Sequence, residues 1–123
     1  MVLVDTSVWV SHFRETHDGL VELLNNGEVV CHPFIIGELA CGNLKNRTSI
    51  LALLEALPTV LVAEHEELLS FIEERRVMGK GLGYVDVHLL AASLLTGVPL
   101  WTLDNRLSRV TEELHCKYRQ RIL

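Results

Sequence analysis

The sequence predicts an α/β fold in which a central, mostly parallel sheet of four to five strands is covered by helices on both faces. Short aliphatic runs typical of buried strands alternate along the chain with longer segments in which apolar residues recur at helical spacing. Strands and helices that alternate in this way form parallel sheets enclosed between two helical layers. With 123 residues, the chain suits one domain, residues 1–123, that can bury a core without disulfides.

The opening stretch, Val2-Leu3-Val4-Asp5-Thr6-Ser7, joins a short buried strand to a polar end, after which a helix is expected to about Glu15. Asp5 therefore stands where a strand leaves the core, and open α/β sheets bind ligands at the carboxyl ends of their strands. Asp5, Thr6 and Ser7 are also favoured helix N-caps. This stretch leaves capping and ligand binding open.

The later elements follow the same alternation. Helices are expected where an apolar helical pattern is closed by a cap or turn residue, over about 18–24, 33–44, 48–57, 64–75, 87–96 and 105–114. Strands are expected at the aliphatic and β-branched runs 29–31, 59–62, 100–103 and 117–123. Pro33 suits the first turn of its helix, because its missing N–H would have no intrahelical partner there.

Composition and charge exclude several classes of protein. Hydrophobic residues form 49% of the chain and charged residues 22%, which excludes disorder as a description of the whole chain. The net charge of −5 gives no general attraction to nucleic acid, so a polyanion would bind through local basic patches or a bound cation. Cys31, Cys41 and Cys116 form no CxxC pair, and no signal-peptide or membrane-span pattern is present. We expect a cytoplasmic protein without a membrane partner.

Three further acids, Glu38, Asp86 and Asp104, occupy positions beside apolar segments or at the end of a strand. Glu38 has apolar neighbours one helical turn away, which places it on or beside the apolar face, unless its side chain turns outward at a boundary position. A buried carboxylate has to be paired, protonated or bound to a metal. Asp86 opens a nearly all-apolar helix, either as a cap or projecting from its end. Asp104 ends a strand, as Asp5 does.

Four acids brought together would repel one another, at about 4 kcal/mol per pair 4 Å apart for an effective dielectric constant near 20. A divalent cation relieves this repulsion, and an all-oxygen ligand set selects Mg²⁺ or Mn²⁺ over Zn²⁺. His88 has no second His or Cys at ligand spacing, so we expect it to make a structural polar contact. Because such ions activate water and stabilise charge during phosphoryl displacement, the acids predict metal-assisted phosphodiester hydrolysis.

A glycine-rich segment after the helix of residues 64–75 carries Arg75, Arg76 and Lys80. Its glycine spacing matches neither a Walker A loop nor a dinucleotide fingerprint. The three cations suit contacts to RNA phosphates, although cations at a helix C-terminus also complement the helix dipole.

Four stretches together resemble, in order and spacing, the motifs of the PIN domain, specifically of VapC-type toxins: residues 2–7, 37–39, 83–92 and 100–104. This resemblance implies a three-layer α/β/α domain with Mg²⁺- or Mn²⁺-dependent endoribonuclease activity on structured cellular RNA. It also implies a homodimer that a VapB-type antitoxin inhibits.

On the same resemblance, the metal-binding and catalytic acids are Asp5, Glu38, Asp86 and Asp104, and Ser7 and Thr102 match the polar residues that support them. Some members of the family carry a further acid just after the last motif, where this chain has Asn105-Arg106. That departure leaves occupancy of a second metal open.

Two alternatives belong to other classes of protein. A phosphotransfer domain with an aspartyl intermediate would have an Asp where Ser7 stands if it were a phosphatase, or an acidic pair and a distal Lys if it were a receiver domain, and neither pattern is present. A non-catalytic module that binds RNA or protein would use the acids to hold a structural ion or to cap helices. In such a module, Asp104→Asn would change the melting temperature and leave RNA affinity intact.

Overall fold

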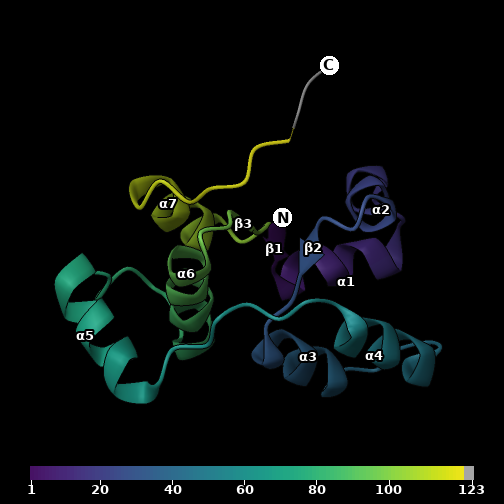
Figure 1. Ribbon diagram of the computed structural model, residues 1–123, viewed down its shortest axis with the longest axis horizontal. Helices are drawn as coiled ribbons and strands as arrows, with labels where there is room; N and C mark the ends of the chain where they lie inside the picture. The colour runs from purple at the N-terminus through teal and green to yellow at the C-terminus, as the bar shows by residue number, and fades with distance from the viewer. Residues whose placement is uncertain (121–123) are drawn as a thin grey trace.

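The computed structural model describes residues 1–120, in which strands and helices alternate as the sequence predicts (Figure 1). The elements follow in the order β1 (Val2–Val4), α1 (Thr6–Arg14), α2 (Asp18–Asn25), β2 (Val29–Val30), α3 (Pro33–Ala40), α4 (Arg47–Ala56), α5 (His65–Arg75), α6 (Tyr84–Thr96), β3 (Leu100–Trp101) and α7 (Asn105–Glu113).

The sheet is parallel, and its strand order β2-β1-β3 places the first strand in the centre. Leu3 pairs with Val30 on one side and with Leu100 on the other. All residues of the three strands are buried. A buried central strand of this kind requires a helical layer on each face. Figure 1 shows α6 on one side of the sheet and α1 with α2 on the other.

The outer strands expected at 59–62 and 117–123 are reduced to one parallel bridge each, Cys31↔Thr59 and Leu100↔Lys117. The described residues thus hold three strands instead of four to five, with single pairings extending both edges. The first edge ends early because the Leu61 backbone N–H donates to the Thr96 hydroxyl, 2.9 Å away, and so leaves the ladder. Residues 121–123 of the last expected strand lie outside the described residues.

The core is built around α6, which is buried along seven consecutive residues, from Val87 to Ser93. A helix that is apolar nearly all round is covered by neighbours on several sides. It packs against α5 and β3, while α3 packs against both α1 and α4. No helix within residues 1–120 has the length and apolar character that crossing a membrane would need.

Two helix boundaries differ from the sequence expectation. The helix expected over 33–44 ends at Ala40, because the chain turns there with the Gly42 N–H bonded to the Leu39 carbonyl. The helix expected to begin at residue 87 begins at Tyr84. Asp86 lies in this added first turn, where its carboxylate accepts a hydrogen bond from the Gly83 N–H.

Candidate active site

Asp5 is a buried acid, 6% exposed, at the carboxyl end of the central strand. It occupies the N-cap position of α1, but its side chain makes no capping hydrogen bond. Its Oδ2 instead accepts hydrogen bonds from Ser7 Oγ at 2.7 Å and from Thr102 Oγ1 at 2.8 Å. Hydrogen bonds to an ionised acceptor are the stronger kind, so the two hydroxyls fix the orientation of this carboxylate. Of the two roles left open for Asp5, the side chain does not take the capping role.

The same two hydroxyls connect the ends of β1 and β3. Ser7 Oγ accepts a hydrogen bond from the Leu103 N–H, and Thr102 Oγ1 accepts one from the Asp104 N–H, each at 3.0 Å. The register of the sheet explains this meeting, since neighbouring parallel strands bring residues from both ends of the chain to one edge. The sequence predicts Ser7 and Thr102 as supporting residues, and the structure places both against Asp5.

Asp104 follows β3 and is exposed. Its Oδ1 accepts a hydrogen bond from the Leu107 N–H at 3.0 Å and so caps α7. Asp86 is half-buried at the start of α6. Burial raises the pKa of the Asp86 carboxyl, the hydrogen bond from Gly83 opposes that rise, and the charges of Asp5 and Asp104 add to it. The Asp86 carboxylate therefore lies close enough to Asp5 and to Asp104 to be repelled by both.

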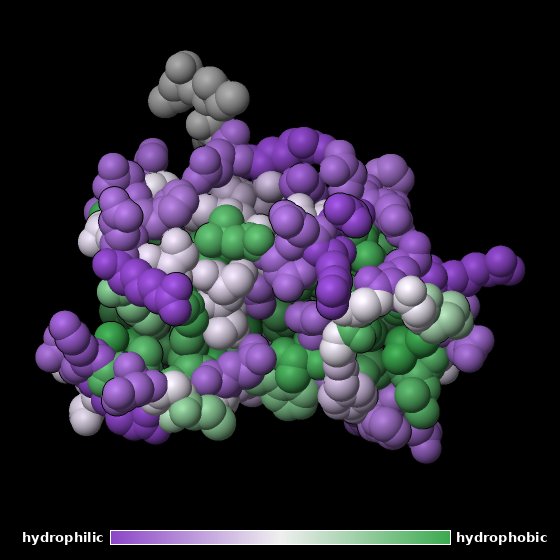
Figure 2. Space-filling model, turned by 180° about the vertical axis from the view of Figure 1, so that it is seen from behind, coloured by the Kyte–Doolittle hydropathy of each residue, from purple (hydrophilic) through white to green (hydrophobic). Residues whose placement is uncertain are grey.

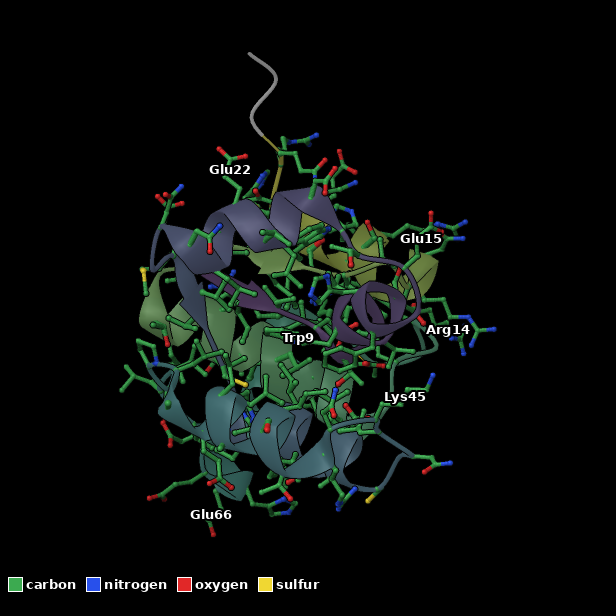
Figure 3. The ribbon with its side chains drawn as sticks, turned by 90° about the vertical axis from the view of Figure 1, so that its right-hand side faces the viewer. Trp9, Arg14, Glu15, Glu22, Lys45 and Glu66 are labelled. Carbon is green, nitrogen blue, oxygen red and sulfur yellow. The ribbon has the colours of Figure 1, made fainter. Side chains whose placement is uncertain are left out.

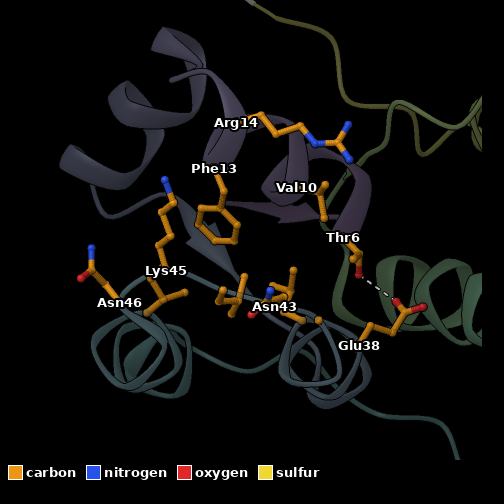
Figure 4. Close-up of a pocket in the computed structure, with 12 residues that line it drawn as sticks. Thr6, Val10, Phe13, Arg14, Glu38, Asn43, Lys45 and Asn46 are labelled. Atoms are coloured by element: carbon orange, nitrogen blue, oxygen red, sulfur yellow. Dashed lines mark hydrogen bonds between the residues drawn. The ribbon is translucent and has the colours of Figure 1, made fainter.

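Glu38 is exposed on α3, so the expected costly position on the apolar face is wrong and the outward orientation is correct. The buried residues of α3 are Ile35 and Leu39, which leaves the neighbouring position 38 at the rim. Its Oε1 accepts a hydrogen bond from Thr6 Oγ1 at 2.7 Å. Because Thr6 directly follows Asp5, this bond brings Glu38 to the start of α1 (Figure 4).

The carboxylates suit a hard divalent cation by their chemistry. In residues 1–120, no three His, Cys, Asp or Glu side chains are close enough to hold a metal ion between them. Each of the four acids has one oxygen hydrogen-bonded and the other without a donor from the described chain. Mg²⁺ binds through one or two carboxylates while keeping waters and substrate phosphates as its other ligands, so it needs no closed protein cage. Carboxylates that repel one another and keep an oxygen without a donor therefore fit such an ion.

The predicted phosphate contacts lie elsewhere. Arg75 ends α5, and Arg76 follows it with left-handed backbone, φ 54°. The Lys80 ammonium forms an ion pair of 2.7 Å with Glu113, which compensates its charge. No hydrogen bond or ion pair within residues 1–120 joins these three cations to the four acids.

Two buried histidines, His32 and His88, lie near the starts of α3 and α6. His32 caps α3 by accepting the Phe34 N–H at Nδ1, 3.0 Å away. Burial lowers the pKa of its imidazole to about 4, and the neighbouring His88 adds to this effect. His88 packs edge-on against the rings of Phe34 and Tyr84, with centroids 4.6 Å away in each case. His88 thus makes structural ring contacts, but its buried Nδ1 has no hydrogen-bond partner among residues 1–120, so the polar contact that the sequence predicts is not found there.

A groove of about 770 Å³ adjoins Glu38 and contains two cations, Arg14 and Lys45, which the sequence analysis does not select. The only sign of the groove in the sequence is the helical spacing of Thr6, Val10 and Phe13, which places these three lining residues on one face of α1.

Comparisons with known proteins agree with this architecture. Residues 2–113 match the family model described as the PIN domain. Over 114 residues, the chain is 46% identical to Ribonuclease VapC32 of Mycobacterium tuberculosis, in both strain CDC 1551 / Oshkosh and strain ATCC 25618 / H37Rv. The match covers 92% of this chain and 92% of that relative. The matched family range contains all four acids and both hydroxyl residues.

Proposed function

This chain belongs to the PIN-domain family, among the VapC-type ribonuclease toxins, and from this membership we propose that it is a metal-dependent endoribonuclease. It hydrolyses phosphodiester bonds in cellular RNA. The observation that carries the proposal is the meeting of Asp5, Ser7, Thr102 and Asp104 at one edge of the sheet. Asp86 lies near enough for the charges of Asp5 and Asp104 to raise the pKa of its carboxyl.

Asp5, Asp86, Asp104 and Glu38 are the proposed ligands of Mg²⁺, for which Mn²⁺ can substitute, with one or two of these carboxylates bound directly and the others reached through water. When bound, the ion supplies an activated water and offsets negative charge on the phosphate. Ser7 and Thr102 hold the Asp5 carboxylate in one orientation, so that its second oxygen faces the site without a competing donor. Glu38 is exposed and has one oxygen without a donor from the described residues, which leaves that oxygen open to the ion. Arg75, Arg76 and Lys80 are proposed as additional phosphate contacts, although Lys80 would first have to leave Glu113.

A VapB-type antitoxin, a homodimeric state and a cytoplasmic location complete the proposal. Several large apolar side chains on the surface support protein partners, including Leu53, Leu61, Leu69 and Leu95, which are 48–60% exposed. Figure 2 shows apolar surface reaching the exterior between polar regions on one face of the molecule.

Asp104→Asn tests the proposal most directly, because asparagine is as good an N-cap as aspartate and should preserve the start of α7. We expect the wild-type protein to cleave RNA in Mg²⁺ or Mn²⁺, a chelator to stop cleavage, and this variant to lose about 100-fold or more in rate. Asp18→Asn, in an exposed acid of α2, is the matched control and should cleave normally. Sequencing of RNA 5′ ends after brief expression of each variant identifies the cleavage sites.

Equal cleavage by the wild-type protein and by Asp104→Asn and Asp5→Asn would contradict the proposal. If neither the wild-type protein nor the variants cleave RNA, and Asp104→Asn changes only the melting temperature, the acids serve a non-catalytic binding module.

A further inference from the structure

A groove between α1 and the connection from α3 to α4 opens beside the candidate active site. It measures about 770 Å³ and is lined by both ends of α1, Thr6 and Arg14. The wall formed by α1 is nine helical residues long, a rise of about 13 Å. Stacked nucleotides rise about 3.4 Å each, so this wall is as long as three or four nucleotides. Figure 4 shows Thr6 and Glu38 on one side, Lys45 and Asn46 on the other, and Phe13 between them.

The groove carries two cations without acidic partners. Arg14 and Lys45 are both exposed, and neither forms an ion pair with any carboxylate of residues 1–120. Figure 3 shows both projecting from the same side of the molecule. By contrast, Lys80, Lys117 and Arg119 are each paired with a glutamate. In a chain of net charge −5, uncompensated cations in a groove that contains Glu38 favour an anionic occupant.

The floor of the groove suits flat apolar groups. Phe13 is half-buried, and its ring packs against Trp9 at a centroid distance of 6.0 Å, which fixes its position. Single-stranded nucleic acids bind grooves that combine cations for the backbone with an aromatic ring on which a base stacks. Asn43 and Asn46, which also line the groove, offer amide donors and acceptors for base edges.

We propose that this groove binds a single-stranded segment of the RNA substrate and leads it to the catalytic acids. Arg14 and Lys45 contact its backbone phosphates, and Phe13 stacks with one base. The inference rests on the proposed ribonuclease function and adds the path of the substrate to it.

The salt dependence of RNA binding tests the inference. The probe is a fluorescent single-stranded RNA of about ten nucleotides, with Asp5→Asn in every protein to prevent cleavage. Replacing Arg14 and Lys45 together by Gln should reduce the slope of log affinity against log salt by about 1.4, since each phosphate contact on a single strand contributes about 0.7. Replacing Lys117 and Arg119 by Gln removes the same charge from cations already paired with Glu112, and should leave the slope unchanged.

Phe13→Leu keeps an apolar side chain and removes the ring. It should weaken RNA binding about tenfold at an unchanged salt slope, because stacking is not an ionic contact. Melting temperatures of all variants report whether they fold.

An unchanged slope in the groove variant, or equal changes in both double variants, would overturn the inference, as would an absence of RNA binding. The same holds if the groove substitutions weaken a protein partner and spare RNA. Each of these results leaves the ribonuclease proposal in place as long as the wild-type protein cleaves RNA, whereas an inactive wild type would count against that proposal itself.

Discussion

At the scale of single residues, the site depends on how hydroxyls orient one buried carboxylate. Thr102 Oγ1 donates to Asp5 Oδ2 and accepts from the Asp104 N–H, so one hydroxyl connects the Asp5 carboxylate to the backbone of Asp104. Asp5 keeps its other oxygen free of donors from the described residues. A carboxylate held in this way loses little conformational freedom when it binds a ligand, which is the benefit of a preorganised site.

Thr102→Val removes this hydroxyl and keeps the shape of the side chain. We expect about a tenfold or greater loss in the rate of RNA cleavage, because a hydrogen bond to a charged group contributes roughly 1.5–3 kcal/mol. Thr102→Ser restores the hydroxyl and should keep most of the rate. Initial cleavage rates at saturating Mg²⁺ compare the variants, and melting temperatures control for folding. If valine retained the wild-type rate, Thr102 would have no part in positioning Asp5.

The sequence is enough to predict that Asp5 and Asp104 meet, but it does not predict the orientation of Glu38. Asp5 and Asp104 each follow a short buried strand, and parallel strands end at a common edge, so their meeting could be predicted. The orientation of Glu38 could not be predicted, because helical spacing places a boundary residue only to within one position of the buried face. Lys80 likewise gave no sign of its pairing with Glu113, which lies 33 residues further along the chain.

At the scale of elements, helix starts were predictable where a local hydrogen bond sets them. The helix expected over 64–75 begins at His65, directly after Glu64, whose N–H is bonded to Glu67 Oε1 at 3.0 Å. Outer strands were less predictable. The run at 59–62 has β-branched residues, yet whether they pair over one residue or four depends on tertiary contacts such as that between Leu61 and Thr96.

His32 makes the start of α3 sensitive to pH. Burial lowers the pKa of this imidazole from 6.5 to about 4, so the unfolded chain takes up a proton at a higher pH than the folded protein does. The free energy of unfolding should therefore be unaffected above pH 6.5 and fall as the pH drops from 6.5 toward 4, by at most about 3 kcal/mol from this group.

His32→Asn isolates this contribution. Asparagine can still accept the Phe34 N–H but does not titrate, so the variant should lose less stability than the wild-type protein over that pH range. Urea unfolding at several pH values measures the difference. Parallel pH profiles for the two proteins would show that His32 titrates normally in the folded state.

At the scale of the whole molecule, the sheet gathers acids from distant parts of the chain. The central position of β1 brings Asp5 to the end of β3, where it contacts Thr102, a residue 97 positions further along the chain. Helix α6 adds Asp86 from a third segment. Folding thus places like charges together at one edge. The alternation of strands and helices predicted this topology, whereas the distances between the acids follow from packing that sequence patterns do not encode.

Concentrated negative charge should make the metal-free fold less stable than it could be. Asp86→Asn keeps an acceptor for the Gly83 N–H and removes the half-buried charge that faces Asp5 and Asp104. We expect it to raise the melting temperature of the metal-free protein by roughly 4 °C, or about 1 kcal/mol, while abolishing RNA cleavage. Glu22→Gln, in an exposed acid of α2, is the control and should change neither.

Divalent cations should reverse this order of stability. A ligand that binds only the folded state stabilises it by mass action, so Mg²⁺ should raise the melting temperature of the wild-type protein and of Glu22→Gln. Asp86→Asn should respond much less, because it has lost a proposed ligand together with the repulsion that the ion relieves. Thermal unfolding with and without Mg²⁺ measures both effects. Equal shifts of the melting temperature in all three proteins would mean that the ion binds elsewhere. If metal-free Asp86→Asn were less stable than the wild-type protein, hydrogen bonding would outweigh charge repulsion at the start of α6.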